Sequence, residues 1–193
     1  DWSSDVCSSD LMPSRFEKTI VGEQPMDIYV GTPAGQGPFP GIIVMFHRSG
    51  IDAFTKDRVE RLAAAGYAAA APDLYHRLPE AMDEPAKMAT LKDIEILADI
   101  QATIENLTKS GMVRRDRLAI LGHCMGGRMA FLGAAANPSF RASVIYYCGN
   151  MFKSWGDGVP TPFDRLSGLK GPVIGFFGNE DRKSTRLNSS HGY

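Results

Sequence analysis

The sequence predicts an α/β fold, with a mostly parallel sheet and helices on both of its faces. Short apolar runs of strand length alternate along the chain with stretches in which apolar residues recur every three or four positions. These are the patterns of strands and of amphipathic helices. The apolar runs are continuous, as is typical of strands buried on both faces of a parallel sheet. Their alternation with helices implies a right-handed series of β-α-β units.

The first part of the chain contains an edge hairpin and two buried strands. Residues 16–30 alternate in character around a glycine and a proline, which predicts a hairpin of two edge strands. After a loop rich in glycine and proline, residues 41–46 form a continuous apolar run. Apolar residues at helical spacing predict a helix over residues 53–65, and the next buried strand covers residues 67–71.

One long helix is expected in the middle of the chain. Residues 84–110 carry apolar side chains at three- and four-residue spacing, which places them on one face. A strand, a helix and two further strands follow, over residues 118–121, 126–136, 143–147 and 173–177. The sequence shows no internal repeat among these elements.

Length and composition indicate one globular domain. The chain has 193 residues, of which 44% are hydrophobic and 22% are charged, and we expect a single domain over residues 12–182. The segments 1–11 and 183–193 are serine-rich and without periodicity. We interpret both as non-native tails, because they resemble translated sequencing adapters; two ordinary disordered tails are the alternative.

Charge and cysteine content argue against several classes of protein. A net charge of −1 offers no basic face for nucleic acid, and no apolar run reaches the roughly 20 residues that a membrane span needs. Cys7, Cys124 and Cys148 are an odd set without metal-type spacing, which argues against a disulfide framework and a zinc site. We therefore expect a cytoplasmic protein, monomeric or weakly dimeric, that acts on a small molecule without a metal or an organic cofactor.

The turn Gly122-His123-Cys124-Met125-Gly126 carries the strongest chemical signal. It connects a predicted strand to a predicted helix, and the glycines on either side of Cys124 allow the two elements to approach closely. A nucleophile in such a turn has a strained backbone and an exposed side chain. The alternative is a buried, inert cysteine in a glycine-rich turn.

The surroundings of this turn suit a reactive thiol. The Met125 amide lies at the N-terminus of the predicted helix, where free N–H groups and the helix dipole stabilise an oxyanion. The same dipole favours the thiolate form of Cys124 over the thiol. We therefore predict that Cys124 is a nucleophile and that the Met125 amide is one oxyanion donor.

Three segments resemble the dienelactone hydrolase family, between Gly41 and Asp181. They are the helix and strand that lead to Pro72-Asp73-Leu74-Tyr75, the cysteine turn at residues 122–127, and the strand that leads to Asp181. The resemblance implies an α/β-hydrolase fold and a Cys, Asp, His triad that opens lactones or esters through an acyl-thioester. It also implies that the chain, which ends soon after Asp181, lacks the last strand and helix of that fold.

The resemblance suggests roles for two further residues. Asp181 would orient the base histidine, in the nucleophile-then-acid order of α/β-hydrolases; a capping or turn aspartate is the alternative. Arg77 would bind a substrate carboxylate through two parallel hydrogen bonds, unless it is a solvated surface arginine. We expect His76 and Asp73 to serve the loop rather than the chemistry.

The sequence departs from the family pattern directly after the strand at residues 41–46. The family often has a glutamate where this chain has Arg48. If Arg48 points into the site, its charge should favour the Cys124 thiolate and make it easier to oxidise. The amide of Arg48 or Ser49 is the candidate second oxyanion donor, and we expect His47 to line the substrate pocket.

The base histidine is not identified in this chain. In the family it follows the aspartate after another helix and strand, whereas His191 follows Asp181 closely in a serine-rich run. We therefore expect little turnover from the 193-residue chain. Three other functions stay open: a general carboxylesterase or thioesterase of the same fold, a non-catalytic ligand-binding protein, and a thiol redox protein that uses Cys124 with Cys148.

Overall fold

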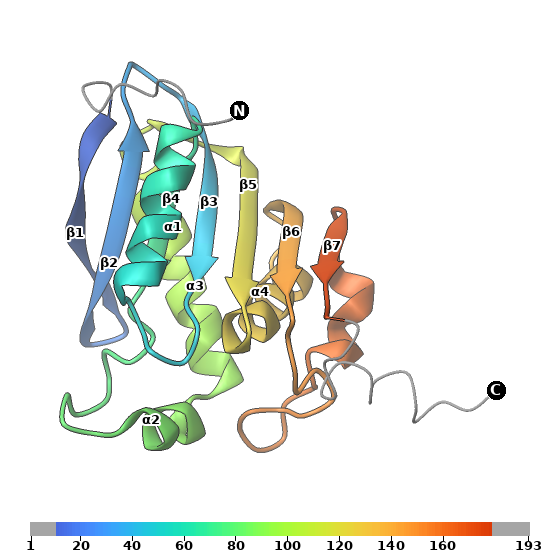
Figure 1. The fold of residues 1–193 in the computed structure, drawn as a ribbon. Coiled ribbons are helices and arrows are strands. Elements are labelled where there is room, and N and C mark those ends of the chain that lie inside the picture. Colours follow the sequence, from blue (N-terminus) through green and yellow to red (C-terminus); the bar gives the residue numbers. More distant parts are fainter. Residues whose placement is uncertain (1–10, 179–193) are drawn as a thin grey trace.

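The computed structural model describes residues 11–178, which form a seven-stranded sheet with helices on either side (Figure 1). The strands are β1 (Leu11–Val21), β2 (Gln24–Pro33), β3 (Phe39–Met45), β4 (Ala68–Pro72), β5 (Val113–His123), β6 (Phe140–Tyr146) and β7 (Val173–Phe176). They lie in the order β1-β2-β4-β3-β5-β6-β7. The α/β class predicted from the sequence is therefore confirmed. Among the described residues, no helix is long and apolar enough to cross a membrane.

The predicted edge hairpin is present and is longer than expected. β1 and β2 pair antiparallel around a turn at Gly22, whose φ of 62° lies in the left-handed region. β2 also pairs antiparallel with β4, but all later neighbours in the sheet are parallel. The carboxyl ends of the parallel strands therefore meet at one edge of the sheet, which is the lower edge in Figure 1.

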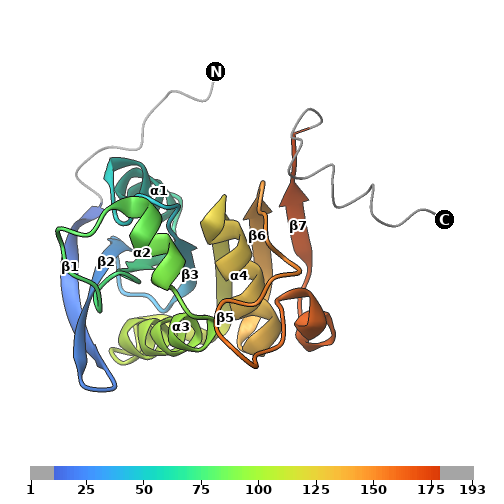
Figure 2. The ribbon, with the colours of Figure 1, turned by 90° about the horizontal axis from the view of Figure 1, so that it is seen from below.

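Helices lie on both faces of the sheet, as Figure 2 shows. Helix α1 (Ala53–Ala64) packs on one face over β2, β4 and β3, whereas α3 (Asp93–Thr108) and α4 (Met125–Ala136) pack on the other. The side chains of β3 alternate accordingly. Val44 lies in the apolar cluster under α1, and its neighbours Ile43 and Met45 lie in the larger cluster under α3 and α4.

The long helix expected over residues 84–110 is two helices. Helix α2 (Glu84–Thr90) ends before Leu91, whose backbone is extended, and α3 begins at Asp93. Asp93 is buried because its carboxylate binds Arg128 of α4. The prediction of one helix was wrong because the regular spacing of apolar residues gives no sign of a tertiary contact. Here the contact between Asp93 and Arg128 accompanies the break between α2 and α3.

Strand β7 is a strand as predicted, but it is not buried. Val173, Ile174 and Phe176 are all exposed. Within the described residues β7 pairs only with β6, and no helix covers β5, β6 or β7 on the α1 side of the sheet (Figures 1 and 2). The short helix η1 (Phe163–Gly168) precedes β7 and packs on α4. An apolar run therefore predicted the conformation of this segment but not its burial.

Candidate active site

Cys124 lies at the sharp turn between β5 and α4, at the carboxyl edge of the sheet. Its φ of 55° and ψ of −118° lie outside the usual range of non-glycine residues, and its side chain is exposed. The Cys124 amide donates to the Tyr146 carbonyl of β6 (2.9 Å), and its carbonyl accepts from the Gly127 amide (3.0 Å). These bonds hold a backbone conformation that costs about 1–3 kcal/mol. The strand-turn-helix geometry predicted for this segment is present.

Two glycines make this turn possible. A Cβ atom at Gly122 would clash with the backbone oxygen of Gly126, and one at Gly126 would clash with the backbone oxygens of Met45 and Phe46. Strand β5, helix α4 and the end of β3 therefore approach one another more closely than side chains would allow. The cysteine turn is thereby fixed against the end of β3, where the next loop begins.

The cavity beside Cys124 has a volume of about 330 Å³ and is lined by His47, Arg48, Phe54, Cys124 and Tyr147. A larger cavity of about 420 Å³ lies among α4, η1 and β7, but its lining is almost entirely apolar and does not include Cys124. We take the smaller cavity as the candidate site, because it combines an exposed thiol with polar groups.

Residues 47–50 form a tight turn at this cavity. The Gly50 amide donates to the His47 carbonyl (3.2 Å), and the Ser49 amide donates to Nδ1 of His47 (3.5 Å). Among the hydrogen bonds between described residues, none uses the Arg48 amide. The Ser49 amide is therefore already engaged, and the role of the Arg48 and Met125 amides as oxyanion donors stays a prediction.

His47 is held by a carboxylate. Its Nε2 lies 3.0 Å from Oδ2 of Asp52, and Oδ1 of Asp52 accepts the Thr55 amide (2.9 Å) and so caps α1. Burial by itself would raise the pKa of Asp52, but the Thr55 hydrogen bonds and the neighbouring His47 hold this pKa below its usual value. An ionised carboxylate therefore ties the pocket histidine to helix α1.

Arg48 turns its side chain toward α2. Its Nε lies 3.4 Å from Oε2 of Glu84, and the side chain is 67% exposed. The Glu84 carboxylate balances part of the charge that Arg48 brings to the cavity. The effect of Arg48 on the Cys124 thiolate stays a prediction.

A row of aromatic rings crosses the sheet next to the cavity. His123 stacks on Tyr146 (4.4 Å between ring centroids) and Tyr146 stacks on Phe176 (4.9 Å), because these residues are register partners on β5, β6 and β7. Burial, followed by nearby cationic groups, lowers the pKa of His123. Tyr147 comes next in the chain with a left-handed φ of 40°. Burial and then the charge of Cys124 raise the pKa of Tyr147, so its phenol stays a hydrogen-bond donor.

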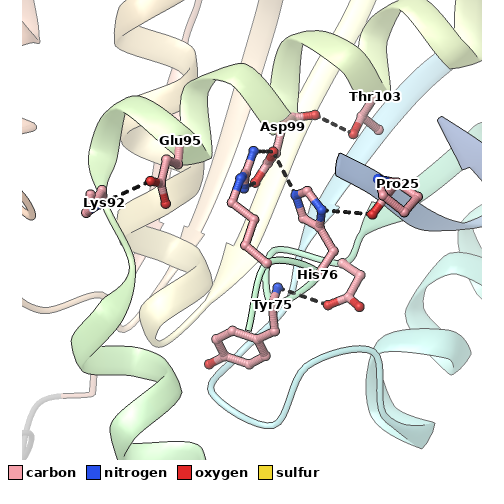
Figure 3. A network of polar contacts seen from close by, with 9 residues as sticks. Pro25, Tyr75, His76, Lys92, Glu95, Asp99 and Thr103 are labelled. Carbon is pink, nitrogen blue, oxygen red and sulfur yellow. Dashed lines mark hydrogen bonds and ion pairs between the residues drawn. The ribbon is translucent and has the colours of Figure 1, made fainter. Parts of the chain in front are cut away.

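Arg77 binds an internal carboxylate. Its terminal nitrogens donate to both oxygens of the buried Asp99 on α3 (2.6 and 2.8 Å). Nε2 of His76 lies 3.3 Å from Asp99, and its Nδ1 lies 2.9 Å from the Pro25 carbonyl. Figure 3 shows this network, in which the Thr103 hydroxyl also donates to the Asp99 carbonyl (2.7 Å). Arg77 does not line the cavity beside the cysteine, and its role as a substrate ligand stays a prediction.

Two of the residues considered from the sequence, Asp181 and His191, lie outside the described residues. Sequence reasoning missed Asp52, although an aspartate directly before a predicted helix is a recognisable N-cap. It also missed Tyr147 as a cavity residue, and no spacing rule points to it. Within residues 11–178, no three His, Cys, Asp or Glu side chains are grouped so that they could hold a metal ion.

Comparison with known sequences gives a family. The chain matches the model of the “Dienelactone hydrolase family” over residues 26–189. It is 34% identical over 164 residues to a Methylorubrum extorquens protein named “Putative carboxymethylenebutenolidase”, which covers 80% of this chain and 55% of that protein. It is also 34% identical over 159 residues to a Bradyrhizobium protein named “Probable 2-oxo-3-(5-oxofuran-2-ylidene)propanoate lactonase”, covering 79% and 64%. The chain thus spans less than two thirds of the length of these relatives.

Solved structures share the fold. A crystal structure of a “Putative Dienelactone Hydrolase” from Klebsiella pneumoniae subsp. pneumoniae is 28% identical, with a TM-score of 0.80 over 92% of this chain and 79% of that chain. A dienelactone hydrolase-like promiscuous phosphotriesterase from metagenomic libraries is 20% identical, with a TM-score of 0.74 over 93% and 76%. The strand order, the cysteine turn and the family match agree: the chain belongs to the dienelactone hydrolase family and has an α/β-hydrolase fold.

Proposed function

We propose that the protein opens lactones or esters through an acyl-enzyme on Cys124. The observation that carries the proposal is the position of this thiol, which is exposed, sits on a strained backbone, and precedes the first residue of α4. A thiol is intrinsically nucleophilic, and a helix N-terminus favours its thiolate form. His47 and Arg48 also line the adjoining cavity, and no hydrogen bond between described residues uses the Arg48 amide.

In the proposed reaction, the Cys124 thiolate adds to the carbonyl carbon of the substrate and the C=O electron pair moves onto oxygen. The amides of Met125 and Arg48 stabilise this oxyanion. The ester C–O bond then breaks, the leaving oxygen takes up a proton, and an acyl-thioester remains on Cys124. Water attacks the thioester and restores the thiol, so that one lactone and one water give a hydroxy acid. We propose that Asp181 orients the base that activates this water.

We propose a substrate that carries a carboxylate. The name of the Bradyrhizobium relative describes a lactonase for a propanoate, which supports a substrate of this chemical class. Arg77 would bind the carboxylate through the N–H groups that Asp99 does not occupy, since each terminal nitrogen of a guanidinium carries two hydrogens.

A thiol redox function has less support. Cys148 is 3% exposed, and burial raises the pKa of its thiol to about 11. A buried thiol with a raised pKa is a poor partner for thiol-disulfide exchange with Cys124.

A single round of acylation, measured as p-nitrophenol released per chain, tests the proposed function without requiring rapid turnover. We expect the unsubstituted protein to release about one equivalent of p-nitrophenol per chain from p-nitrophenyl acetate, and Cys124→Ala to release none above the buffer rate. Cys148→Ala is the matched control and should behave like the unsubstituted protein. Equal release by Cys124→Ala would show that another group carries the reaction.

A further inference from the structure

The loop at residues 47–50, called here the oxyanion loop, is held from outside by side chains of two other segments. The Thr55 hydroxyl of α1 donates to the Gly50 carbonyl (3.1 Å). The Tyr75 hydroxyl donates to the Arg48 carbonyl (2.8 Å). Tyr75 belongs to the turn after β4, which is remote in sequence from the oxyanion loop.

Tyr75 is a rigid donor. Its side chain is buried, and its ring packs on Phe46 at the end of β3 (5.0 Å between centroids). The Tyr75 amide donates to Oδ1 of Asp73 (3.0 Å), which fixes the backbone beneath the ring. Burial, and then the charges of Glu84 and Asp73, raise the pKa of Tyr75, so the hydroxyl keeps its proton.

The bond from Tyr75 acts on the central peptide of the oxyanion loop. Since the Gly50 amide donates to the His47 carbonyl, Arg48 and Ser49 are the two central residues of a β-turn, and the peptide between them is the one whose orientation differs between turn types I and II. Its carbonyl now points to Tyr75 and its amide to the His47 ring. Rotation of this peptide would turn the carbonyl dipole toward His47, which lines the cavity, and would disfavour an oxyanion there.

We propose that Tyr75 is a positioning residue: its hydroxyl holds the peptide between Arg48 and Ser49 so that the Arg48 carbonyl stays turned away from the developing oxyanion on the substrate. The inference rests on the proposed function. It adds that the turn after β4 stabilises the transition state without touching the substrate, because it keeps a carbonyl dipole from opposing the oxyanion.

Two reactions of the same thiol test this role. Acylation of Cys124 by p-nitrophenyl acetate passes through a tetrahedral oxyanion, whereas alkylation by iodoacetamide is a direct displacement at carbon and forms none. A residue that holds a carbonyl dipole away from the oxyanion should affect the first rate and spare the second. Both rates are measured under pseudo-first-order conditions, and mass spectrometry of peptides locates the modification on Cys124.

Tyr75→Phe removes the hydroxyl and keeps the ring against Phe46. We expect acylation to slow about tenfold, less than the 10²–10³ that loss of a whole oxyanion donor costs, and alkylation to stay within twofold. Tyr29→Phe is the matched control, because it removes a hydroxyl that bonds Glu60 on helix α1, and both of its rates should be unchanged. Thermal unfolding of each variant verifies that the fold is retained.

The outcomes separate the two proposals. If acylation by the unsubstituted protein is normal and Tyr75→Phe leaves it unchanged, the inference about Tyr75 is wrong and the proposed function stands. If Tyr75→Phe slows acylation and alkylation equally, the hydroxyl acts on the thiol or on the fold, which also overturns the inference. If the unsubstituted protein is alkylated at Cys124 but never acylated there, both proposals fail.

Discussion

The guanidinium of Arg128 and the carboxylate of Asp93 form a two-bond ion pair (2.6 and 3.0 Å) whose side chains are 0% and 1% exposed. Arg128 also donates to the carbonyls of Asn150 (3.2 Å) and Lys153 (2.5 Å). Its guanidinium lies 3.9 Å from the ring centroid of Trp155. The pair therefore joins the start of α3, the first turn of α4 after the cysteine, and the segment that follows β6.

Replacing Arg128 should strongly destabilise the protein. Arg128→Met leaves the Asp93 carboxylate buried without its partner, which costs about 3–5 kcal/mol of unfolding free energy. Arg61→Met breaks an exposed pair with Asp57 on α1 and should cost less than about 1 kcal/mol. Urea unfolding of both variants measures the difference. Equal losses would mean that the buried pair contributes no more than a surface pair.

The cysteine turn should not tolerate a side chain at Gly126. Gly126→Ala places a methyl group against the backbone oxygens of Met45 and Phe46, so α4 must move away from β3 and carry the cysteine with it. We expect a lower melting temperature and slower acylation of Cys124. Gly149→Ala is the control, because nothing lies within 4 Å of its added methyl group. An unaltered acylation rate in Gly126→Ala would contradict the close approach.

Replacing Arg77 should have two separately measurable effects, one on the unfolding free energy and one on the preference for anionic substrates. Arg77→Gln leaves the buried Asp99 with a weaker partner, and we expect it to lower the unfolding free energy by about 2 kcal/mol. If Arg77 also binds the substrate carboxylate, the variant should acylate more slowly with an anionic ester than with a neutral ester of similar size. Destabilisation with an unchanged ratio of the two rates would limit Arg77 to its structural contact with Asp99.

His123 should make stability depend on pH. Burial lowers its folded-state pKa below the ordinary 6.5, so the unfolded chain binds a proton on this residue before the folded chain does. Where the unfolded state binds more protons, the unfolding free energy falls as the pH falls. We therefore expect stability to decrease below about pH 6.5, and to decrease less in His123→Phe, which keeps an aromatic ring against Tyr146. If the unfolding free energies of the two proteins depended on pH in the same way, His123 would make no such contribution to stability.

Much of the fold and the cysteine turn could be predicted from the sequence. Both depend on local spacing: continuous apolar runs for the strands, three- and four-residue periods for the helices, and the positions of Gly122 and Gly126 around the cysteine. These glycines are required by the close approach of backbones in the structure, as the spacing indicated.

The features that could not be predicted depend on partners far apart in the chain. The break between α2 and α3 accompanies the contact of Asp93 with Arg128, and the side chain of Arg77 is turned inward by Asp99. The exposure of β7 depends on what lies beside it rather than on its own apolar residues. No local pattern encodes these pairings.

The central claim is that Cys124 forms an acyl-enzyme, and the mass of the trapped intermediate tests it most directly. The protein is mixed with p-nitrophenyl acetate, quenched in acid during the first phase of p-nitrophenol release, and digested for mass spectrometry. We predict an added acetyl group on the peptide that contains Cys124, in an amount equal to the p-nitrophenol released. Release of p-nitrophenol at the normal rate with no acetyl group on Cys124 would contradict the account.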